Sequence, residues 1–479
     1  MVFNSFAFLL FFPIVTILFF LLPHKFRWVL LLAASCFFYM YFRPVYILVI
    51  FFTIIVDYFA GILIYRAQGK KRKWFLAMSI VANVGVLAIF KYYNFLDSNV
   101  GALANVFHFT NPIPALNILL PIGLSFHTFQ AMSYTIEVYR GNCLPERKFN
   151  IYSLYVLFYP QLVTGPIERP GNLIHQFYEK KEFDPDRVGR GLQQMCWGLF
   201  KKVVIADRIS IYVDTVYANV HLYTGVTFWF TSSMFLMQIY CDFSGYSDIA
   251  IGAANVMGFT LMQNFKRPFF SRNIAEFWTR WHISLTTWFR DYVYFSLGGS
   301  RVSVPRWYFN IMAVFLLSGL WHGASWNFVL WGGTLGACMV LALIFKKQNE
   351  AISNAIGIQK RFPTLASAFD MLVVYLIVSF ACIFFRAKTF HDALFVIKHL
   401  FIFERQKPAF FGTADNFIYS IFGIAILFLV EYSQEFIIKK EVLWQPATPV
   451  IRYVFYATVI SIFFLIGVFN GGQFLYFQF

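Results

Sequence analysis

The fold class is indicated most clearly by residues 45–73, which read VYILVIFFTIIVDYFAGILIYRAQGKKRK. The first 21 of these residues carry a single charge, Asp57. A helix needs about 20 apolar residues to cross the roughly 30 Å hydrocarbon core of a bilayer. The next eight residues, 66–73, contain five Lys or Arg. An apolar run followed directly by a dense basic cluster is typical of a transmembrane helix that ends at the cytoplasmic face.

The whole chain has the composition of a polytopic membrane protein. Of its 479 residues, 59% are hydrophobic, 13% are charged and 63 are Phe, whereas a soluble domain is about 25% charged. Intrinsic disorder, a nucleic-acid-binding fold and a disulfide-stapled secreted fold are excluded as first interpretations. The net charge of +16 comes from Lys and Arg between the apolar runs, where they set orientation and meet anionic headgroups. The six cysteines show no CxxC spacing.

The apolar runs predict an all-α fold of about 11–12 transmembrane helices in one integral membrane domain, 1–479. The first run is expected to be an uncleaved span, because it lacks a basic leader and a cleavage site. The shorter run 151–163 is predicted to be a re-entrant half-helix. The candidate spans are 5–22, 28–42, 45–65, 74–94, 115–139, 226–241, 244–259, 307–321, 325–345, 365–385, 417–433 and 451–469.

The basic residues also predict the orientation of the chain. If 66–73 is cytoplasmic, alternation places the N-terminus and the loop 96–113 on the extracytoplasmic side. The charged stretch that follows Pro170, to about Arg208, is expected to be cytoplasmic.

The richest group of polar residues in apolar sequence lies at 238–255, QIYCDFSGYSDIAIGAAN. Polar residues inside a membrane are costly, so each is a functional candidate. The favoured interpretation is a polar turn between two spans, with Gly245 relieving the backbone. The alternative is that Asp242 and Asp248 line a cavity and orient a histidine or arginine elsewhere.

The next segment, 266–301, has no strongly apolar run and is predicted to be an amphipathic helix at the membrane interface or in a funnel. A belt helix anchored by its tryptophans is the simpler interpretation. His282 falls near the boundary of its two stripes, which alone does not make it catalytic. The stripes would be a polar one of Glu276, Arg280, Ser284, Thr287 and Asp291 and an aromatic one of Trp278, Trp281, Leu285 and Trp288.

His322 stands at the junction of two strongly apolar segments, between Gly319 and Gly323. Desolvation disfavours the charged imidazolium there, so the ring is expected to be neutral. A neutral imidazole can accept a proton from a hydroxyl or attack a thioester, but a hydrogen-bonded core histidine is equally common. His127 could also face a cavity. The sequence contains no HExxH motif, Gly-rich phosphate loop or metal-ligand cluster, so no metal is predicted.

Five motifs occur together in a specific order. They are PIGLSFHTFQ (121–130), FYPQLVTGPIER (158–169), DFSGYSDIAIG (242–252), FWTRWHISLTTWFRDY (277–292) and GLWHGASW (319–326). With the first residues, MVFNS, and the last, LYFQF, this set resembles the membrane-bound O-acyltransferase family from end to end. The resemblance is to its bacterial branch, which contains the alginate O-acetyltransferase membrane subunit, the lipoteichoic acid D-alanyl transfer protein and peptidoglycan O-acetyltransfer subunits.

The resemblance implies a ring of transmembrane helices around a thin core, with a cytoplasmic funnel for the acyl donor. It implies an enzyme that moves an acetyl group from a cytoplasmic thioester, acetyl-CoA or an acyl carrier, to an extracytoplasmic, alginate-like polysaccharide. The family's central histidine corresponds to His322 and its second motif histidine to His282. His322 is then the expected general base, with an acyl-imidazole as the less favoured variant, and His282 polarises the thioester carbonyl or passes the acyl group on.

Binding residues and partners follow from the same interpretation. Arg280 or Lys266 would attract the donor phosphates, and no bound cofactor is expected. The remaining candidates for substrate or donor binding are Asp242, Asp248, Trp281, Trp321 and Ser318.

Little sequence lies outside the membrane to hold a long glycan, so a periplasmic or extracellular serine-dependent acetyltransferase is the expected partner. The expected location is the bacterial inner membrane. The alternatives are peptidoglycan O-acetylation, D-alanyl transfer to teichoic acid from a carrier protein and, in a different class, a polysaccharide or lipid transporter.

Overall fold

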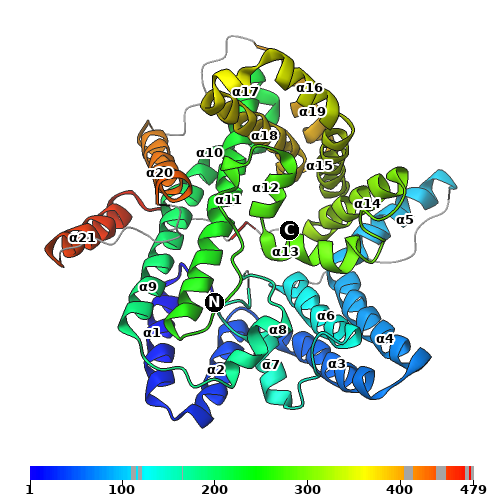
Figure 1. Ribbon diagram of the computed structural model, residues 1–479, viewed down its shortest axis with the longest axis vertical. Coiled ribbons are helices and arrows are strands. Elements are labelled where there is room, and N and C mark those ends of the chain that lie inside the picture. The colour runs from blue at the N-terminus through cyan, green and yellow to red at the C-terminus, as the bar shows by residue number, and fades with distance from the viewer. Residues whose placement is uncertain are drawn as a thin grey trace. The chain divides into compact units, whose positions relative to one another are not determined.

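The computed structural model describes residues 1–108, 115–116, 121–163, 165–403, 414–438, 449–469 and 474–475, and within them the backbone forms helices and connecting turns without strands (Figure 1). The helices group into two compact units, each discontinuous in sequence. Unit 1 comprises Met1–Cys196 and Tyr246–Met262, and unit 2 comprises Trp197–Gly245 and Gln263–Phe479. The all-α prediction is confirmed, and the single domain 1–479 stays a prediction.

Unit 1 contains the N-terminal helices, most of which are apolar. The helices are α1 (Phe6–Leu21), α2 (His24–Met40), η1 (Pro44–Tyr46), α3 (Ile47–Arg66), α4 (Gly69–Leu87), η2 (Ala88–Tyr92), α5 (Tyr93–Val106), α6 (Leu124–Arg140), α7 (Phe149–Leu157), α8 (Pro170–Leu173) and η3 (Ile174–Phe177), with most of α9 (Pro185–Leu199) and the last part of α11 (Gly225–Val256).

Unit 2 contains the first part of α11 and the C-terminal helices. Its further elements are η4 (Phe200–Ala206), α10 (Asp207–Ala218), η5 (Val220–Leu222), η6 (Pro268–Phe270), α12 (Ile274–Arg280), α13 (Ile283–Phe289), η7 (Arg290–Tyr294), α14 (Val304–His322), α15 (Trp326–Ile344), α16 (Lys346–Ile356), α17 (Ile358–Arg361), α18 (Pro363–Arg386), α19 (Phe390–His399), α20 (Ala414–Tyr432), η8 (Ser433–Ile437) and α21 (Pro449–Ile466).

Several helices are long and apolar enough to cross a membrane. In the described part of the chain there are five: Pro44–Arg66, Gly69–Val106, Trp326–Ile344, Pro363–Arg386 and Asp415–Ile437. Large apolar side chains also point outward from the 16-residue α1, where Phe6 and Leu21 are each 75% exposed. Such a surface is suited to lipid and not to water. The chain is therefore a multi-pass membrane protein, whereas the total of about 11–12 spans stays a prediction.

Two predicted boundaries in unit 1 are wrong. The helix that begins at Gly69 continues through the π-helical turn η2 to Val106, so most of the predicted loop 96–113 is helical, and its residues 109–114 lie outside the described part. The predicted span 115–139 begins as a helix only at Leu124, and 117–120 are likewise outside the described part. Gly123 precedes this helix with φ +76°, and a Cβ there would lie 2.8 Å from the carbonyl oxygen of Leu162.

The predicted polar turn near Gly245 is also wrong, because α11 is one continuous helix of 32 residues. Gly245 serves close helix packing instead. A Cβ at this position would lie 2.7 Å from the carbonyl oxygen of Gly198 on α9. Further along α11, a Cβ at Gly252 would lie 2.6 Å from the carbonyl oxygen of Gly191. The small residues that suggested a turn therefore allow α9 and α11 to approach closely.

The run predicted as a re-entrant half-helix contains the short helix α7. Nine residues rise only about 14 Å, which is half of the hydrocarbon thickness. Every residue from Ile151 to Val163 is buried in the protein. At membrane depth, a segment that does not span the bilayer is tolerated when it is buried in protein, as α7 is.

A buried carboxyl group ties three helices of unit 1 together. Asp57 on α3 is fully buried and accepts hydrogen bonds from Ser79 Oγ (2.6 Å) and Asn83 Nδ2 (2.8 Å), both on α4. Ser79 Oγ also lies 3.0 Å from Thr135 Oγ1 on α6. Asp57, the single charged residue of the run 45–65, is thus hydrogen-bonded by polar side chains of neighbouring helices, because an unpaired carboxyl group inside a membrane is costly.

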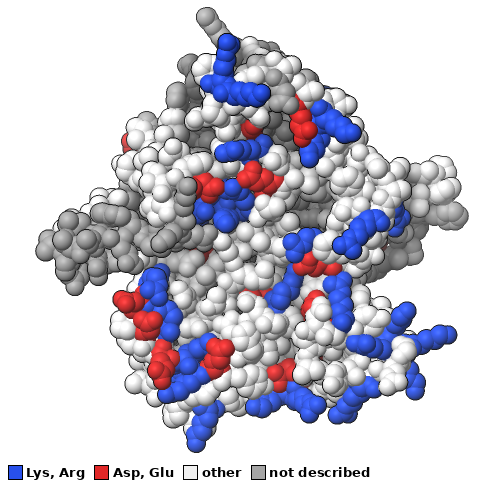
Figure 2. All heavy atoms as spheres, viewed as in Figure 1, with Lys and Arg blue, Asp and Glu red and all other residues white. Residues whose placement is uncertain are grey.

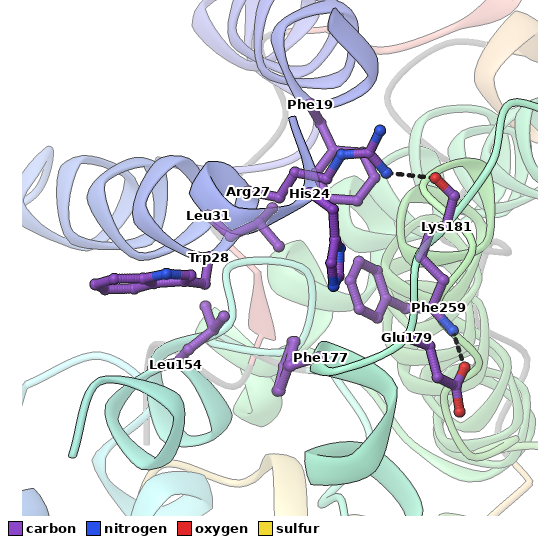
Figure 3. Close-up of a pocket in the computed structure, with 10 residues that line it drawn as sticks. All are labelled: Phe19, His24, Arg27, Trp28, Leu31, Leu154, Phe177, Glu179, Lys181 and Phe259. Carbon is purple, nitrogen blue, oxygen red and sulfur yellow. Dashed lines mark hydrogen bonds and ion pairs between the residues drawn. The ribbon is translucent and has the colours of Figure 1, made fainter. Parts of the chain in front are cut away.

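Charged groups of unit 1 gather at helix ends. Figure 2 shows basic side chains clustered where α3 and α4 meet, and the link there carries the exposed Arg66, Lys70, Lys71 and Lys73. A small hollow lies at the α1–α2 turn, lined by His24, Arg27 and Lys181 among others (Figure 3).

The cations of this hollow are already engaged within unit 1. The Arg27 guanidinium donates to the carbonyl oxygens of Leu22 (3.0 Å) and Lys181, and Lys181 Nζ pairs with Glu179 at 2.5 Å. The hydrogen bond from Arg27 to Lys181 therefore links the α1–α2 turn to the segment before α9.

Candidate active site

His322 is held at the C-terminal end of α14 by very close packing between α14 and α15, which run side by side (Figure 1). The contact depends on glycine in both helices. A Cβ on Gly319 would lie 2.2 Å from the carbonyl oxygen of Phe328, and a Cβ on Gly332 would lie 2.2 Å from that of Phe315. Only residues without a side chain allow two backbones to approach this far.

The imidazole of His322 is buried among aromatic rings. The residue is 5% exposed. Its ring centroid lies 4.9 Å from those of Trp321 and Trp331 and 5.6 Å from that of Phe385 on α18, all with edge-to-face geometry. These rings exclude water around His322 and limit its rotation.

The segment that carries His282 is not the single helix predicted for 266–301. It forms two helices of seven residues each, α12 and α13, which are broken at Trp281–His282, where His282 has φ +43°. Two backbone hydrogen bonds hold the break: Ile283 N donates to Asn264 O and Lys266 N to Arg280 O, both at 2.8 Å. The predicted polar and aromatic stripes therefore do not form.

The break turns His282 inward and away from the membrane surface. The residue is 2% exposed, and its ring contacts Phe243 edge-on with centroids 4.5 Å apart. Trp281 is also buried, which corrects the interpretation of a surface belt of tryptophans. Burial lowers the pKa of His282 to about 3, so the imidazole is neutral at physiological pH.

The two histidines, 40 positions apart in the sequence, face one region of unit 2. Their ring centroids are 6.4 Å apart, and Trp321 contacts both rings, at 6.0 Å from His282. An atom hydrogen-bonded to a ring nitrogen lies about 4 Å from the ring centroid. The separation of the two rings is therefore small enough to permit one group to contact both imidazoles.

Arg280 contacts carboxylates in this structure. Its guanidinium pairs with Glu276 on the same helix at 2.7 Å and with Glu435 on η8 at 2.8 Å. The other oxygen of Glu435 pairs with Arg267, also at 2.8 Å. One carboxylate therefore bridges two arginines close to His282 in the chain.

Asp242 belongs to a buried charge cluster that the sequence interpretation missed. Lys202 Nζ lies 2.7 Å from both Asp207 and Asp242, and all three side chains are at most 5% exposed. Lys201, Lys202 and Arg208 belong to the stretch expected to be cytoplasmic, and all three are buried in η4 and α10. The sequence offered a signal, because both lysines are flanked by apolar residues, as in Leu-Phe-Lys-Lys-Val-Val.

The same cluster holds part of the C-terminal segment. Leu475 N donates to Asp242 Oδ2 at 2.8 Å, and the buried Phe474 packs on Phe243 with ring centroids 5.8 Å apart. Because Phe243 contacts His282, these two residues of the chain end contribute to the packing behind the histidine. The final residues, 476–479, lie outside the described part.

The other predicted residues fall in different places. Asp248 lies in unit 1, where Gln194 Nε2 donates to it at 3.2 Å. Ser318 is half-buried on α14. His127 is buried in unit 1, with its ring 6.1 Å from that of Tyr39. Among the described residues, no group of three or more His, Cys, Asp or Glu is arranged to hold a metal ion.

Comparison with known proteins places this arrangement in a family. The model of the membrane-bound O-acyltransferase (MBOAT) family matches residues 148–387, which include both histidines and the α14–α15 pair. The chain belongs to the MBOAT family. The resemblance that the motifs predicted is therefore confirmed, and so are the all-α polytopic fold and the acyltransferase class.

Three relatives of the MBOAT chain illustrate its range. It is 36% identical to the probable alginate O-acetylase AlgI of Pseudomonas aeruginosa, over 84% of this chain and 75% of the relative. It is 32% identical to the peptidoglycan O-acetyltransferase of Helicobacter pylori, over 77% and 72%. It is 27% identical to the teichoic acid D-alanyltransferase of Bacillus subtilis, over 69% and 82%.

Proposed function

We propose that this MBOAT protein transfers an acetyl group from a cytoplasmic thioester to the hydroxyl group of an acceptor. The acetyl group is used for O-acetylation of an extracytoplasmic, alginate-like polysaccharide. The observation that carries the proposal is the buried pair of His282 and His322, whose rings are 6.4 Å apart. The similarity to alginate O-acetylases supports the acyl group and acceptor class. Family membership favours acyl transfer over the transporter alternative.

The chemistry assigns different tasks to the two imidazoles. His322 takes the proton of the acceptor hydroxyl as its oxygen attacks the thioester carbonyl. The C–S bond then breaks, and the leaving thiolate takes the proton. His282, which burial keeps neutral, donates an N–H hydrogen bond to the carbonyl oxygen as negative charge develops there. The aromatic rings around both histidines keep water from competing with the acceptor.

The proposal includes a location and a partner. The expected location is a bacterial inner membrane, with the basic α3–α4 link in the cytoplasm and the N-terminus outside. A periplasmic or extracellular acetyltransferase then passes the group to the glycan. Acetyl-CoA is the expected donor.

Two acceptor alternatives come from the relatives. Peptidoglycan O-acetylation is favoured by the 32% identity to the Helicobacter pylori enzyme. D-Alanyl transfer from a carrier protein has the weaker support of 27% identity. Mass analysis of surface glycans from cells with and without the gene distinguishes all three, because the acyl group and the sugar differ in mass.

The test of the mechanism is the variant His322→Ala, compared with His391→Ala, whose side chain is exposed on α19. General-base catalysis is worth about 10²–10⁴-fold in rate. We expect a loss of that size for His322→Ala and little change for His391→Ala, measured as acetyl transfer from labelled acetyl-CoA at equal membrane expression. Near-normal transfer by His322→Ala would refute the assigned role.

A further inference from the structure

The two arginines bridged by Glu435 lie in the backbone segments that also position His282. Arg280 lies two residues before His282, and Arg267 follows Lys266, whose backbone N–H donates to the carbonyl oxygen of Arg280. Any group held by both arginines is therefore positioned relative to the histidine through a few backbone hydrogen bonds. This arrangement distinguishes the pair from an isolated surface ion pair.

The backbone on both sides of the pair is unusual. Arg267 has φ +45°, a left-handed conformation that residues with a side chain rarely adopt. Glu435 lies in the π-helical turn η8 at the end of α20, and single π-helical turns are frequent at functional sites. Strained or irregular backbone persists where the surroundings enforce it, commonly at ligand sites.

The geometry of the bridge resembles that of a bound oxyanion. Oε2 of Glu435 pairs with Arg267 and Oε1 with Arg280, each at 2.8 Å. Two guanidinium groups that hold separate oxygens of one anion are suited to a phosphate, which Arg recognises with the same charge-assisted hydrogen bonds as a carboxylate. The side chains of Arg267, Arg280 and Glu435 are 10%, 18% and 16% exposed, so part of the site contacts solvent.

We propose that Arg267 and Arg280 form the binding site for a phosphate group of the acyl donor, and that Glu435 occupies this site until the donor displaces it. The inference rests on the proposed use of a phosphate-bearing thioester donor. In the free enzyme Glu435 pairs with both arginines, and Glu276 also pairs with Arg280, so displacement of Glu435 makes donor binding an exchange of anions. The site thereby selects donors with a phosphate over simple thioesters.

The experiment measures binding to the purified full-length protein for three probes: CoA, 4′-phosphopantetheine and pantetheine, which carries no phosphate. We expect Glu435→Gln to tighten CoA binding about fivefold, because the competing charge is removed. Arg280→Gln is expected to weaken it about tenfold or more. The control is Arg272→Gln, which removes an exposed arginine from the same segment and is expected to change CoA affinity little.

The outcomes separate the proposal from its alternatives. Effects on CoA and 4′-phosphopantetheine alike assign the site to the phosphate that CoA shares with carrier proteins, whereas effects on CoA alone assign it to the nucleotide phosphates. Weaker or unchanged CoA binding by Glu435→Gln, or equal effects of Arg280→Gln on pantetheine, would overturn the proposal. Misfolding cannot imitate the expected result, because it does not tighten binding. Since binding is measured without transfer, a failure of the proposed acetyl transfer remains a separate result.

Discussion

The substitution Gly319→Ala tests whether the close α14–α15 contact positions His322. The added Cβ would lie 2.2 Å from the carbonyl oxygen of Phe328, whereas carbon–oxygen contacts are normally about 3.3 Å or longer. The clash is with a backbone atom, so no change of rotamer relieves it. The two helices must separate locally by roughly 1 Å, and such overpacking costs about 1–3 kcal/mol.

The same displacement moves His322, which ends the last turn of α14 and packs against Trp331 of the facing helix. A misplacement of about 1 Å in a catalytic group can cost about 100-fold in rate. We therefore expect Gly319→Ala to fold with reduced thermal stability and to lose about two orders of magnitude in kcat. Thermal unfolding in detergent and acetyl transfer from labelled donor measure the two effects.

The matched control is Gly333→Ala on α15. Its Cβ would meet only the Leu316 Cδ2 methyl, at an ordinary 3.4 Å, and alanine favours the helix. We expect this variant to be as stable and as active as the parent. Equal activity of Gly319→Ala and Gly333→Ala would show that close helix packing does not position the histidine.

Two further predictions concern buried charge. Burial raises the pKa of Glu168, in the loop after α7, to about 7, so its ionisation should destabilise the fold as pH rises above about 4.5. Relative to Glu168→Gln, the parent should lose about 3 kcal/mol of stability between about pH 4.5 and pH 8. Thermal-unfolding profiles that run parallel with pH for the two proteins would contradict this. Lys202→Met leaves Asp207 and Asp242 without their cation and should lower the stability by about 3–5 kcal/mol in thermal-denaturation measurements. The control Lys388→Met, at an exposed position, should change the stability little. Equal stability of the two variants would refute the role of the cluster.

The sequence by itself determined the class of the protein and most helix positions, and it proposed the two histidines as site candidates. Hydropathy is a local property, so a run such as 45–65 reveals a membrane helix without knowledge of its neighbours. The motifs around His282 and His322 carried the family for a similar reason, because they are contiguous. Where local signals were ambiguous the prediction failed: small residues near Gly245 suggested a turn, although they serve helix packing in the continuous α11.

Only the tertiary structure decided how the site is assembled. Glu435 pairs with Arg280 although 155 positions separate them, and Lys202 pairs with Asp242 on another helix. No local pattern in the sequence identifies these residues as partners. The break at His282 likewise depends on a hydrogen bond to Asn264 that helical periodicity does not contain. Charges in an apolar interior must find partners wherever the fold brings them, because the energy of an uncompensated charge exceeds any local preference. Those partnerships are set by packing in three dimensions, and the order of residues along the chain does not encode them directly.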